Sequence, residues 1–276
     1  RALKLALQNT AGVKRKDLRQ HDEIVMTCLC ELMPDYDTDG ASGAAVSYMM
    51  LKELGANGEY YTNNRFEQGY GMCISGIDEI KKLYPDVKLI MTIDNGIVAF
   101  NEAEYLKKLG VKLIITDHHE QGEGLPIADA IVNPKRVDST YPFDGICGAV
   151  VVWKVLRELY ENKNEANKYL DILAIATVGD VVPLVDENRI IVKEGLKLLN
   201  NNSRKSLAIL REMTNTTEIS SHFTLGFIYS PIFNAVSRLG GDISSVIDVL
   251  VSEDEEFIRK NITELININE KRKALT

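Results

Sequence analysis

The sequence lacks the features that mark several classes of protein. No apolar run reaches the roughly 18 residues that a membrane helix needs, and residues 1–10 lack the apolar stretch of a signal peptide. No CxxC motif is present, so a zinc ribbon is not supported. No segment repeats at a fixed period or is low in complexity. We therefore expect a globular protein of the cytoplasm that has no membrane partner.

Cysteine is scarce, with four in 276 residues: Cys28, Cys30, Cys73 and Cys147. Cys28 and Cys30 would face the same side of a strand. They could form a metal or redox pair, but buried free thiols in a reducing compartment are the favoured interpretation.

Positive charge is also in short supply. Lys and Arg number 32 against 40 Asp and Glu, which gives a net charge of −8. Because nucleic-acid phosphates attract cations, this balance alone argues against nucleic-acid binding. However, many of the acids could be metal ligands, and a local basic groove can exist on an acidic protein.

The order of predicted elements indicates an α/β fold. Strands are predicted at 24–30, 59–62, 87–93, 111–116 and 128–132, and helices at 40–54, 77–84, 99–109, 145–160 and 169–182. This alternation predicts a parallel sheet with helices on both faces.

The later part of the chain changes character. Helices are predicted at 190–213 with an interruption near 200–203, at 243–251, and at 253–275 with Ser252 as its cap, and 214–221 is predicted as a polar loop. We expect a catalytic domain at 1–188, followed by a mostly helical region at 189–276.

Acids and histidines follow three of the predicted strands. Asp35, Asp37 and Asp39 follow the first, Asp94 follows the second, and Asp117, His118 and His119 follow the third, while Asp180 closes a helix. Ligands of such sheets lie beyond the carboxyl ends of the strands. Several carboxylates crowded together need cations to neutralise them. Carboxylate oxygens with imidazole nitrogen suit Mn²⁺, Mg²⁺ or Zn²⁺, and two ions about 3.5–4 Å apart would promote phosphoryl displacement.

Each cluster has a simpler explanation when it is taken alone. DYDTDG at 35–40 could be a surface turn, or the start of a calcium loop, although the Glu that closes such a loop is replaced by Val46. Asp94 could cap a strand, and the histidines could be an exposed pair. Their joint position at the ends of strands in one sheet favours a metal centre.

The motifs resemble the DHH phosphoesterase superfamily, and in particular the RecJ-type single-strand exonucleases. The matching stretches are DYDTDG (35–40), NRFEQGYG (64–71), IDNGI (93–97), TDHHE (116–120), VNPKR (132–136), GAVVVWKV (148–155), ATVGDVVPL (176–184) and NAVSRLG (234–240). They follow the family's order and cover nearly the whole chain.

The resemblance implies a two-metal phosphodiesterase that degrades single-stranded DNA from its 5′ end, with Mn²⁺ favoured and Mg²⁺ as the alternative. Asp35 and Asp37 would bind separate ions, Asp94 would bridge them, His118 and Asp180 would complete the second site, and Asp39 would be a further ligand or a supporting acid. Asp117 would orient its neighbours, while His119, Arg65 and Arg238 would contact the substrate phosphate. A metal-bound hydroxide would attack phosphorus in line. Phe66 and Tyr70 are candidates for stacking on bases.

The sequence departs from the family pattern in two places. Pro34 replaces the usual Gly before the first motif, and Glu31 is either a substitute ligand or an acid in the strand. The second C-terminal lobe of the family, with its Gly-Gly-Gly-His-like motif, is not found before Thr276, and the chain begins with Arg1 rather than Met. We expect a fragment, or a partner chain that completes the cleft.

Two other functions remain open at this point. One is a phosphoesterase for short RNA, pAp or cyclic dinucleotides, which Pro34 favours; pyrophosphatase activity is disfavoured by the extended motifs. The other is a non-catalytic scaffold in replication or repair, against which the complete set of core ligands argues.

Overall fold

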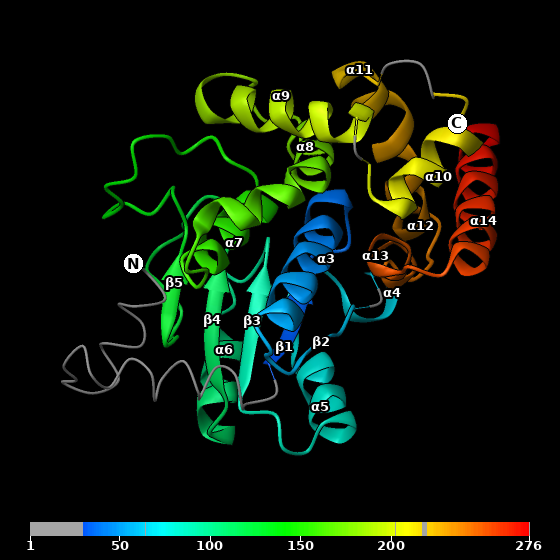
Figure 1. Ribbon diagram of the computed structural model, residues 1–276. Helices are drawn as coiled ribbons and strands as arrows, with labels where there is room; N and C mark the ends of the chain where they lie inside the picture. Colours follow the sequence, from blue (N-terminus) through cyan, green and yellow to red (C-terminus); the bar gives the residue numbers. More distant parts are fainter. Residues whose placement is uncertain (1–29, 64, 202, 217–219, 276) are drawn as a thin grey trace.

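The centre of the protein is a single parallel sheet. A computed structural model describes residues 30–63, 65–201, 203–216 and 220–275, without the side chains of Arg65 and Glu67. Five strands pair in the order β2-β1-β3-β4-β5 (Figure 1). Their bounds are β1 Cys30–Pro34, β2 Gly58–Tyr60, β3 Leu89–Ile93, β4 Lys112–Thr116 and β5 Ala130–Val132. Every pairing is parallel, which confirms the predicted fold class.

The first strand ends later than predicted. It spans Cys30–Pro34, whereas residues 24–29 of the predicted strand lie outside the described part of the chain. Glu31 and Pro34 made this segment a poor strand by propensity, but Leu32 and Met33 are both buried and face opposite cores. Tertiary packing therefore decides the strand here, as it often does for β structure.

Helices cover both faces of the sheet because alternate strand residues point to opposite sides. On one face, Leu32 and Met91 belong to the apolar core that includes α3 Thr38–Glu53, α7 Gly148–Arg157 and α8 Leu170–Gly179. On the other face, Met33 and Ile90 belong to the core formed with α5 Ile74–Leu83 and α6 Phe100–Leu109. The three central strands are consequently almost fully buried, whereas β2 and β5 at the edges are half-buried.

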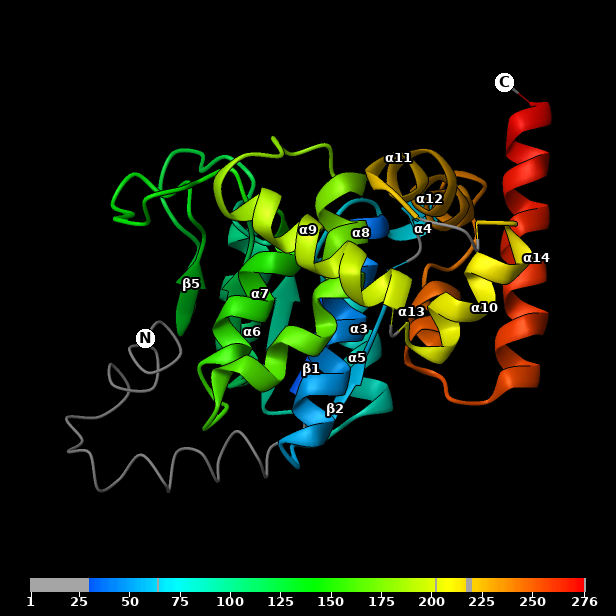
Figure 2. The same ribbon diagram turned by 45° about the horizontal axis from the view of Figure 1, so that its top comes forward.

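The C-terminal part of the described chain is helical, as predicted, and it extends the first core. The remaining elements are α4 Arg65–Gln68, η1 Lys163–Tyr169, α9 Asp186–Asn201, α10 Lys205–Met213, α11 His222–Thr224, η2 Leu225–Tyr229, α12 Ser230–Arg238, α13 Ser244–Val251 and α14 Glu255–Ala274. Buried side chains of α9, α10, α12, α13 and α14 belong to the same apolar cluster as those of α3 and α8 (Figure 2). The division of the chain at residue 188 stays a prediction.

One local prediction in this region needs correction, and one helical stretch was not predicted. The helices between 222 and 238 were not predicted, because their apolar positions follow no regular period through the π-helical turn η2. The last helix is capped by Asp254, whose side chain accepts from the amides of Glu256 and Phe257. Ser252 lies before this cap and accepts a hydrogen bond from the Asp254 amide instead.

Glu31 is an unusual residue within the sheet. Its side chain is 0% exposed, and neither carboxylate oxygen has a hydrogen-bond partner. The register places Glu31 beside Glu59 of the neighbouring strand. Burial, and secondarily the Glu59 charge, raise the pKa of Glu31 to about 8. A buried carboxyl without partners destabilises the fold.

Replacing Glu31 by methionine should therefore stabilise the protein by about 1–3 kcal/mol. Because the pKa of Glu31 is raised in the folded state, ionisation of this group opposes folding. The free energy of unfolding is therefore highest below the ordinary pKa of 4.5 and falls as the pH rises through about 8. The gain from Glu31→Met should consequently be larger at pH 9 than at pH 6. Urea unfolding at both pH values measures it. A lower urea midpoint in the variant would mean that the carboxyl group stabilises the sheet.

Candidate metal centre

Three acids occupy equivalent positions at the carboxyl edge of the sheet. Asp35, Asp94 and Asp117 are each the first residue after a strand. Each amide donates to the last residue of the neighbouring strand, at 3.0, 2.9 and 3.1 Å respectively. The sheet ladder thus continues one residue beyond the strands and holds the three acids in a row.

This row crosses the point where the direction of the chain through the sheet reverses. From β1 the chain first adds β2 on one side and then β3 on the other. The loops that leave β1 and β3 diverge there, and open α/β sheets bind their ligands in the resulting crevice. Asp37 and Asp39 belong to the loop and helix start after β1, and Asp37 caps α3 by accepting from the amides of Asp39 and Gly40.

The structure brings together all six predicted metal ligands. Together with His119 they form three overlapping groups: Asp35, Asp37 and Asp94; Asp39, His118 and Asp180; and Asp94, His118 and His119. Within each group the ligand atoms lie within 4.8 Å of one another. Asp94 belongs to two of these groups, as does His118. Glu31 belongs to none of the groups found among the described residues.

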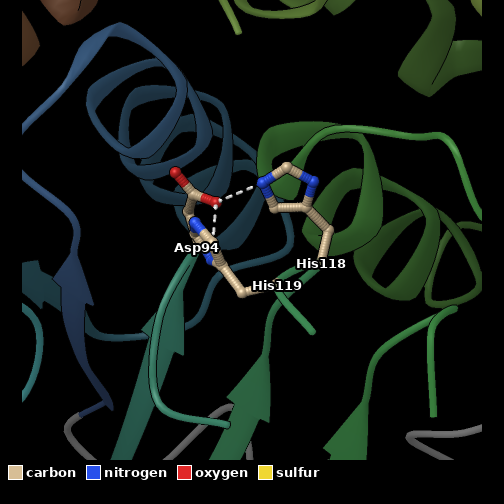
Figure 3. Close-up of side chains that lie close together, drawn as sticks. All are labelled: Asp94, His118 and His119. Carbon is tan, nitrogen blue, oxygen red and sulfur yellow. Dashed lines mark ion pairs between the residues drawn. The ribbon is translucent and has the colours of Figure 1, made fainter. Parts of the chain in front are cut away.

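Several atoms of this cluster lack the partners that buried polar atoms normally have. Asp94 Oδ1, Asp180 Oδ2 and both ring nitrogens of His118 are buried without a hydrogen-bond partner. His118 Nε2 nevertheless lies 3.0 Å from Asp94 Oδ1 and 3.7 Å from Asp180 Oδ2. Figure 3 shows both imidazole rings beside the Asp94 carboxylate. Oxygen and nitrogen donors that converge without hydrogen bonds between them fit a divalent cation.

Burial is the main reason why the pKa values of the clustered carboxyl groups are raised, and repulsion between the carboxylates adds to it. Burial raises the pKa of Asp35 to about 7, and Asp37 adds to the effect. Burial likewise raises the pKa of Asp180 to about 7 and that of Asp39 to about 6. The pKa of Asp94 is raised well above its ordinary value by burial and by the surrounding carboxylates. Cations bound among these groups would favour the ionised forms.

Asp39 differs from the other predicted metal ligands because hydrogen bonds from backbone amides occupy both of its oxygens. Oδ2 accepts from the Gly148 amide at 2.6 Å, and Oδ1 accepts from the Ala149 amide at 3.0 Å. These amides open helix α7, where a negative charge is favoured. Asp39 therefore joins the starts of α3 and α7 behind the cluster.

Asp117 and His119 form a separate hydrogen-bonded unit. Asp117 Oδ2 accepts from the Ile97 amide at 2.9 Å, and Oδ1 lies 2.8 Å from His119 Nδ1. Burial raises the pKa of Asp117, but these hydrogen bonds outweigh burial and hold it below its ordinary value. The bond to Asp117 raises the pKa of His119, whose side chain is 45% exposed. Tyr70 contacts the other ring nitrogen, with its hydroxyl 3.2 Å from Nε2.

The residues predicted to contact phosphate or bases differ in their surroundings. Arg238 is exposed at the end of α12, one turn after Asn234, whose Oδ1 accepts from the amide and hydroxyl of Thr38. Tyr70 lies beside His119, whereas Phe66 is exposed and lies near Gly240. The side chain of Arg65 lies outside the described part of the structure.

Two residues of the site were missed because only tertiary contacts reveal them. A Cβ atom at Gly148 would lie 2.5 Å from Asp94 Oδ1, so the start of α7 approaches that carboxylate too closely for any other residue. Asn234 bonds to the DYDTDG segment across 196 residues of sequence. Both occur within the quoted motifs, which was the only signal available.

Several known proteins are similar to this chain over most of its length. A model of the DHH family, N-terminal domain, matches residues 31–177. The single-stranded-DNA-specific exonuclease RecJ of Bacillus subtilis is 36% identical over 87% of this chain and 30% of its own length, and that of Escherichia coli is 33% identical over 87% and 44%. The chain thus spans less than half the length of each of these curated relatives.

Solved structures give the same result. A crystal structure of exonuclease RecJ bound to manganese aligns with a TM-score of 0.80 and 29% identity, over 96% of this chain and 68% of that one. RecJ of Thermus thermophilus in complex with Mn²⁺ aligns with a TM-score of 0.76 and 26% identity, over 96% and 39%. No helix in the described residues is both long enough and apolar enough to cross a membrane.

Proposed function

The chain belongs to the DHH family, and on that premise we propose that it is a phosphodiesterase that uses two divalent ions to remove nucleotides from the 5′ end of single-stranded DNA. The observation that carries this proposal is the meeting of two ligand groups at Asp94 and His118. The relatives named as single-stranded-DNA-specific exonucleases support the choice of substrate. The manganese-bound structures support Mn²⁺ as the preferred ion, with Mg²⁺ as the alternative.

Each ligand has a role in this proposal. Asp35, Asp37 and Asp94 would hold one ion, while Asp94, His118 and Asp180 would hold the other. Two such ions, when bound, stabilise charge on the attacking and leaving oxygens of a phosphoryl displacement. Asp39, whose oxygens are already occupied by the amides of α7, would act from behind by fixing the start of that helix rather than as a full ligand.

The substrate phosphate would be held at the exposed side of the centre. Asp117 keeps the His119 ring in place and favours its protonated form, so His119 can donate to a phosphate oxygen. We assign the guanidinium fork that holds the phosphate to Arg238, which is exposed one turn after Asn234, and to Arg65. Tyr70, which contacts His119, would lie beneath a terminal base.

The domain organisation follows from the same premise. We propose a catalytic domain at 1–188 and a helical region at 189–276 that leads to a second lobe, supplied by further chain or by a partner. That lobe would close the cleft over the strand.

A nuclease assay tests the proposed function. We expect the protein with Mn²⁺ to shorten a 5′-phosphorylated single-stranded DNA, labelled at its 3′ end, in steps that release mononucleotides. Asp94→Ala should lower the rate by at least about 1,000-fold, because both ions lose a ligand. Gel electrophoresis of the labelled strand measures both rates.

The other outcomes separate the remaining possibilities. Hydrolysis of dinucleotides or pAp without cleavage of DNA would move the assignment to small substrates. If the protein binds two Mn²⁺ ions by calorimetry but cuts nothing, this chain lacks a part that catalysis needs. Absence of both metal binding and cleavage would leave only the scaffold interpretation.

A further inference from the structure

A groove of 670 Å³ lies between helix α9 and the start of α11. Its near end is Leu184, four residues after Asp180. Four residues span at most about 14 Å, so the groove begins within that distance of the centre. Figures 1 and 2 place α9 and α11 on the side of the molecule to which the carboxyl ends of the strands point.

One wall of the groove is a row of cations. Arg189, Lys193 and Lys197 line it, and each is exposed. Their spacing of four residues puts them on one face of α9, about 6 Å apart. Lys197 pairs with Glu194, whereas Arg189 and Lys193 form no ion pair within the described ranges. On a chain with a net charge of −8, such a row gives a local field that would attract a polyanion.

The opposite wall leads to two stacked aromatic rings. His222 lines the groove, and the next residue, Phe223, stacks on Phe227 with 4.4 Å between ring centroids and an interplanar angle of 21°. The two phenylalanines are 57% and 69% exposed. Gly226, between them, packs against Val178 near the end of α8. The segment that carries the stacked pair therefore contacts the end of α8, two residues before Asp180.

A strained residue adds an apolar contact next to Asp180. Val181 has a φ of 61° and is 85% exposed. A β-branched residue rarely adopts this conformation, which costs energy and is typically kept at functional sites. An apolar side chain held outward beside a metal ligand gives a surface that a planar base can cover.

We propose that this groove binds an unpaired nucleic-acid strand, with phosphates on Arg189 and Lys193 and bases stacked on Phe223 and Phe227. The placement of the strand's end at the metal centre rests on the proposed function, whereas binding in the groove does not. Exposed aromatic faces beside a cationic track are typical of single-strand binding, because only unpaired bases offer their faces for stacking. The net charge of the whole chain gives no sign of this cationic row, because the row consists of a few residues on one helix.

Binding without cleavage tests the groove. Fluorescence anisotropy in EDTA would measure the affinity of (dT)12, labelled with fluorescein at its 3′ end, as a function of salt concentration. Arg189→Gln with Lys193→Gln should reduce the slope of log K against log salt by about 1.4, at about 0.7 for each lost phosphate contact. Phe223→Leu with Phe227→Leu should weaken binding by about tenfold and leave the slope unchanged, because only stacking is lost.

A matched control removes two exposed lysines from the helices on the far face of the sheet. Lys82→Gln with Lys108→Gln changes the charge by the same amount and should leave the slope as it is. If the groove variants also keep the wild-type slope and affinity, the proposal is wrong and the groove is available for a protein partner. Mn²⁺ affinity measured by calorimetry should be unaffected by the groove variants, because none of the four substituted residues belongs to the ligand groups. Absence of both Mn²⁺ binding and DNA hydrolysis by the wild-type protein would overturn the proposed function but not the groove.

Discussion

Replacing Gly148 by alanine should lower the rate of metal-dependent hydrolysis by about 100-fold or more. The added Cβ atom would lie 2.5 Å from both Cβ and Oδ1 of Asp94, so the carboxylate must move. Helix α7 cannot easily retreat, because the Gly148 and Ala149 amides are bound to the buried Asp39. A displacement of about 1 Å at a catalytic group can cost a factor of about 100. Initial rates on single-stranded DNA, together with Mn²⁺ affinity by calorimetry, measure the effect.

Two other glycines separate damage to the centre from damage to the fold. Gly43→Ala would crowd Ile93 and Ala149 in the packing of α3 against its neighbours, without touching a ligand carboxylate. It should destabilise the protein but leave the Mn²⁺ affinity of the folded form intact. Gly122→Ala meets nothing closer than 4.0 Å and should be neutral. A Gly148→Ala protein with the wild-type rate would show that the position of Asp94 does not govern catalysis.

The metal-free protein should become less stable as the pH rises from 5 to 8, and Mn²⁺ should reverse this trend. Asp35, Asp39 and Asp180 have pKa values raised to about 7, 6 and 7. Their contribution to stability is complete below the ordinary value of 3.8 and is lost as the pH rises through 6 to 7, because the folded state then binds more protons than the unfolded chain. The lowered pKa of His118 acts in the opposite direction, but it is a single group.

Thermal unfolding in EDTA and in Mn²⁺ at pH 5 and pH 8 measures this dependence. Free Mn²⁺ at 100 times its dissociation constant would add about 2.7 kcal/mol, which corresponds to a rise in melting temperature of roughly 5–10 °C for a chain of this size. The rise should be greater at pH 8, where the ligands are ionised, than at pH 5. Asp94→Ala is the control and should show little response to Mn²⁺. A melting temperature in EDTA that increases from pH 5 to pH 8 would contradict the prediction.

The sheet and the positions of its ligands were predictable because both depend on local pattern. Apolar runs separated by helical segments determine the parallel sheet, and polar residues directly after those runs must meet at one edge. Asp94 and Asp117 follow β3 and β4 as the sequence indicated. The end of β1 was harder to predict, because Glu31 and Pro34 have low strand propensity. Packing on both faces of the sheet, which the sequence does not reveal, makes this segment a strand.

Contacts between distant segments could not be predicted in this way. Nothing near Gly148 in the sequence indicates that a carboxylate 54 residues earlier lies against it. The occupation of both Asp39 oxygens by α7 distinguishes that acid from Asp35, although the two share one motif. The helices at 222–238 depend on burial against α8, and their π-helical turn interrupts the periodicity by which a helix is recognised.

The order in which the cluster residues occur along the chain has a consequence for biosynthesis. Asp35, Asp37 and Asp39 leave the ribosome first, Asp94 and His118 follow, and Asp180 emerges last. At about 5–20 residues per second, several seconds separate the first three carboxylates from the last. The strands that align the early acids are complete before α8 exists, so a nascent chain carries crowded carboxylates that lack their full set of neighbours.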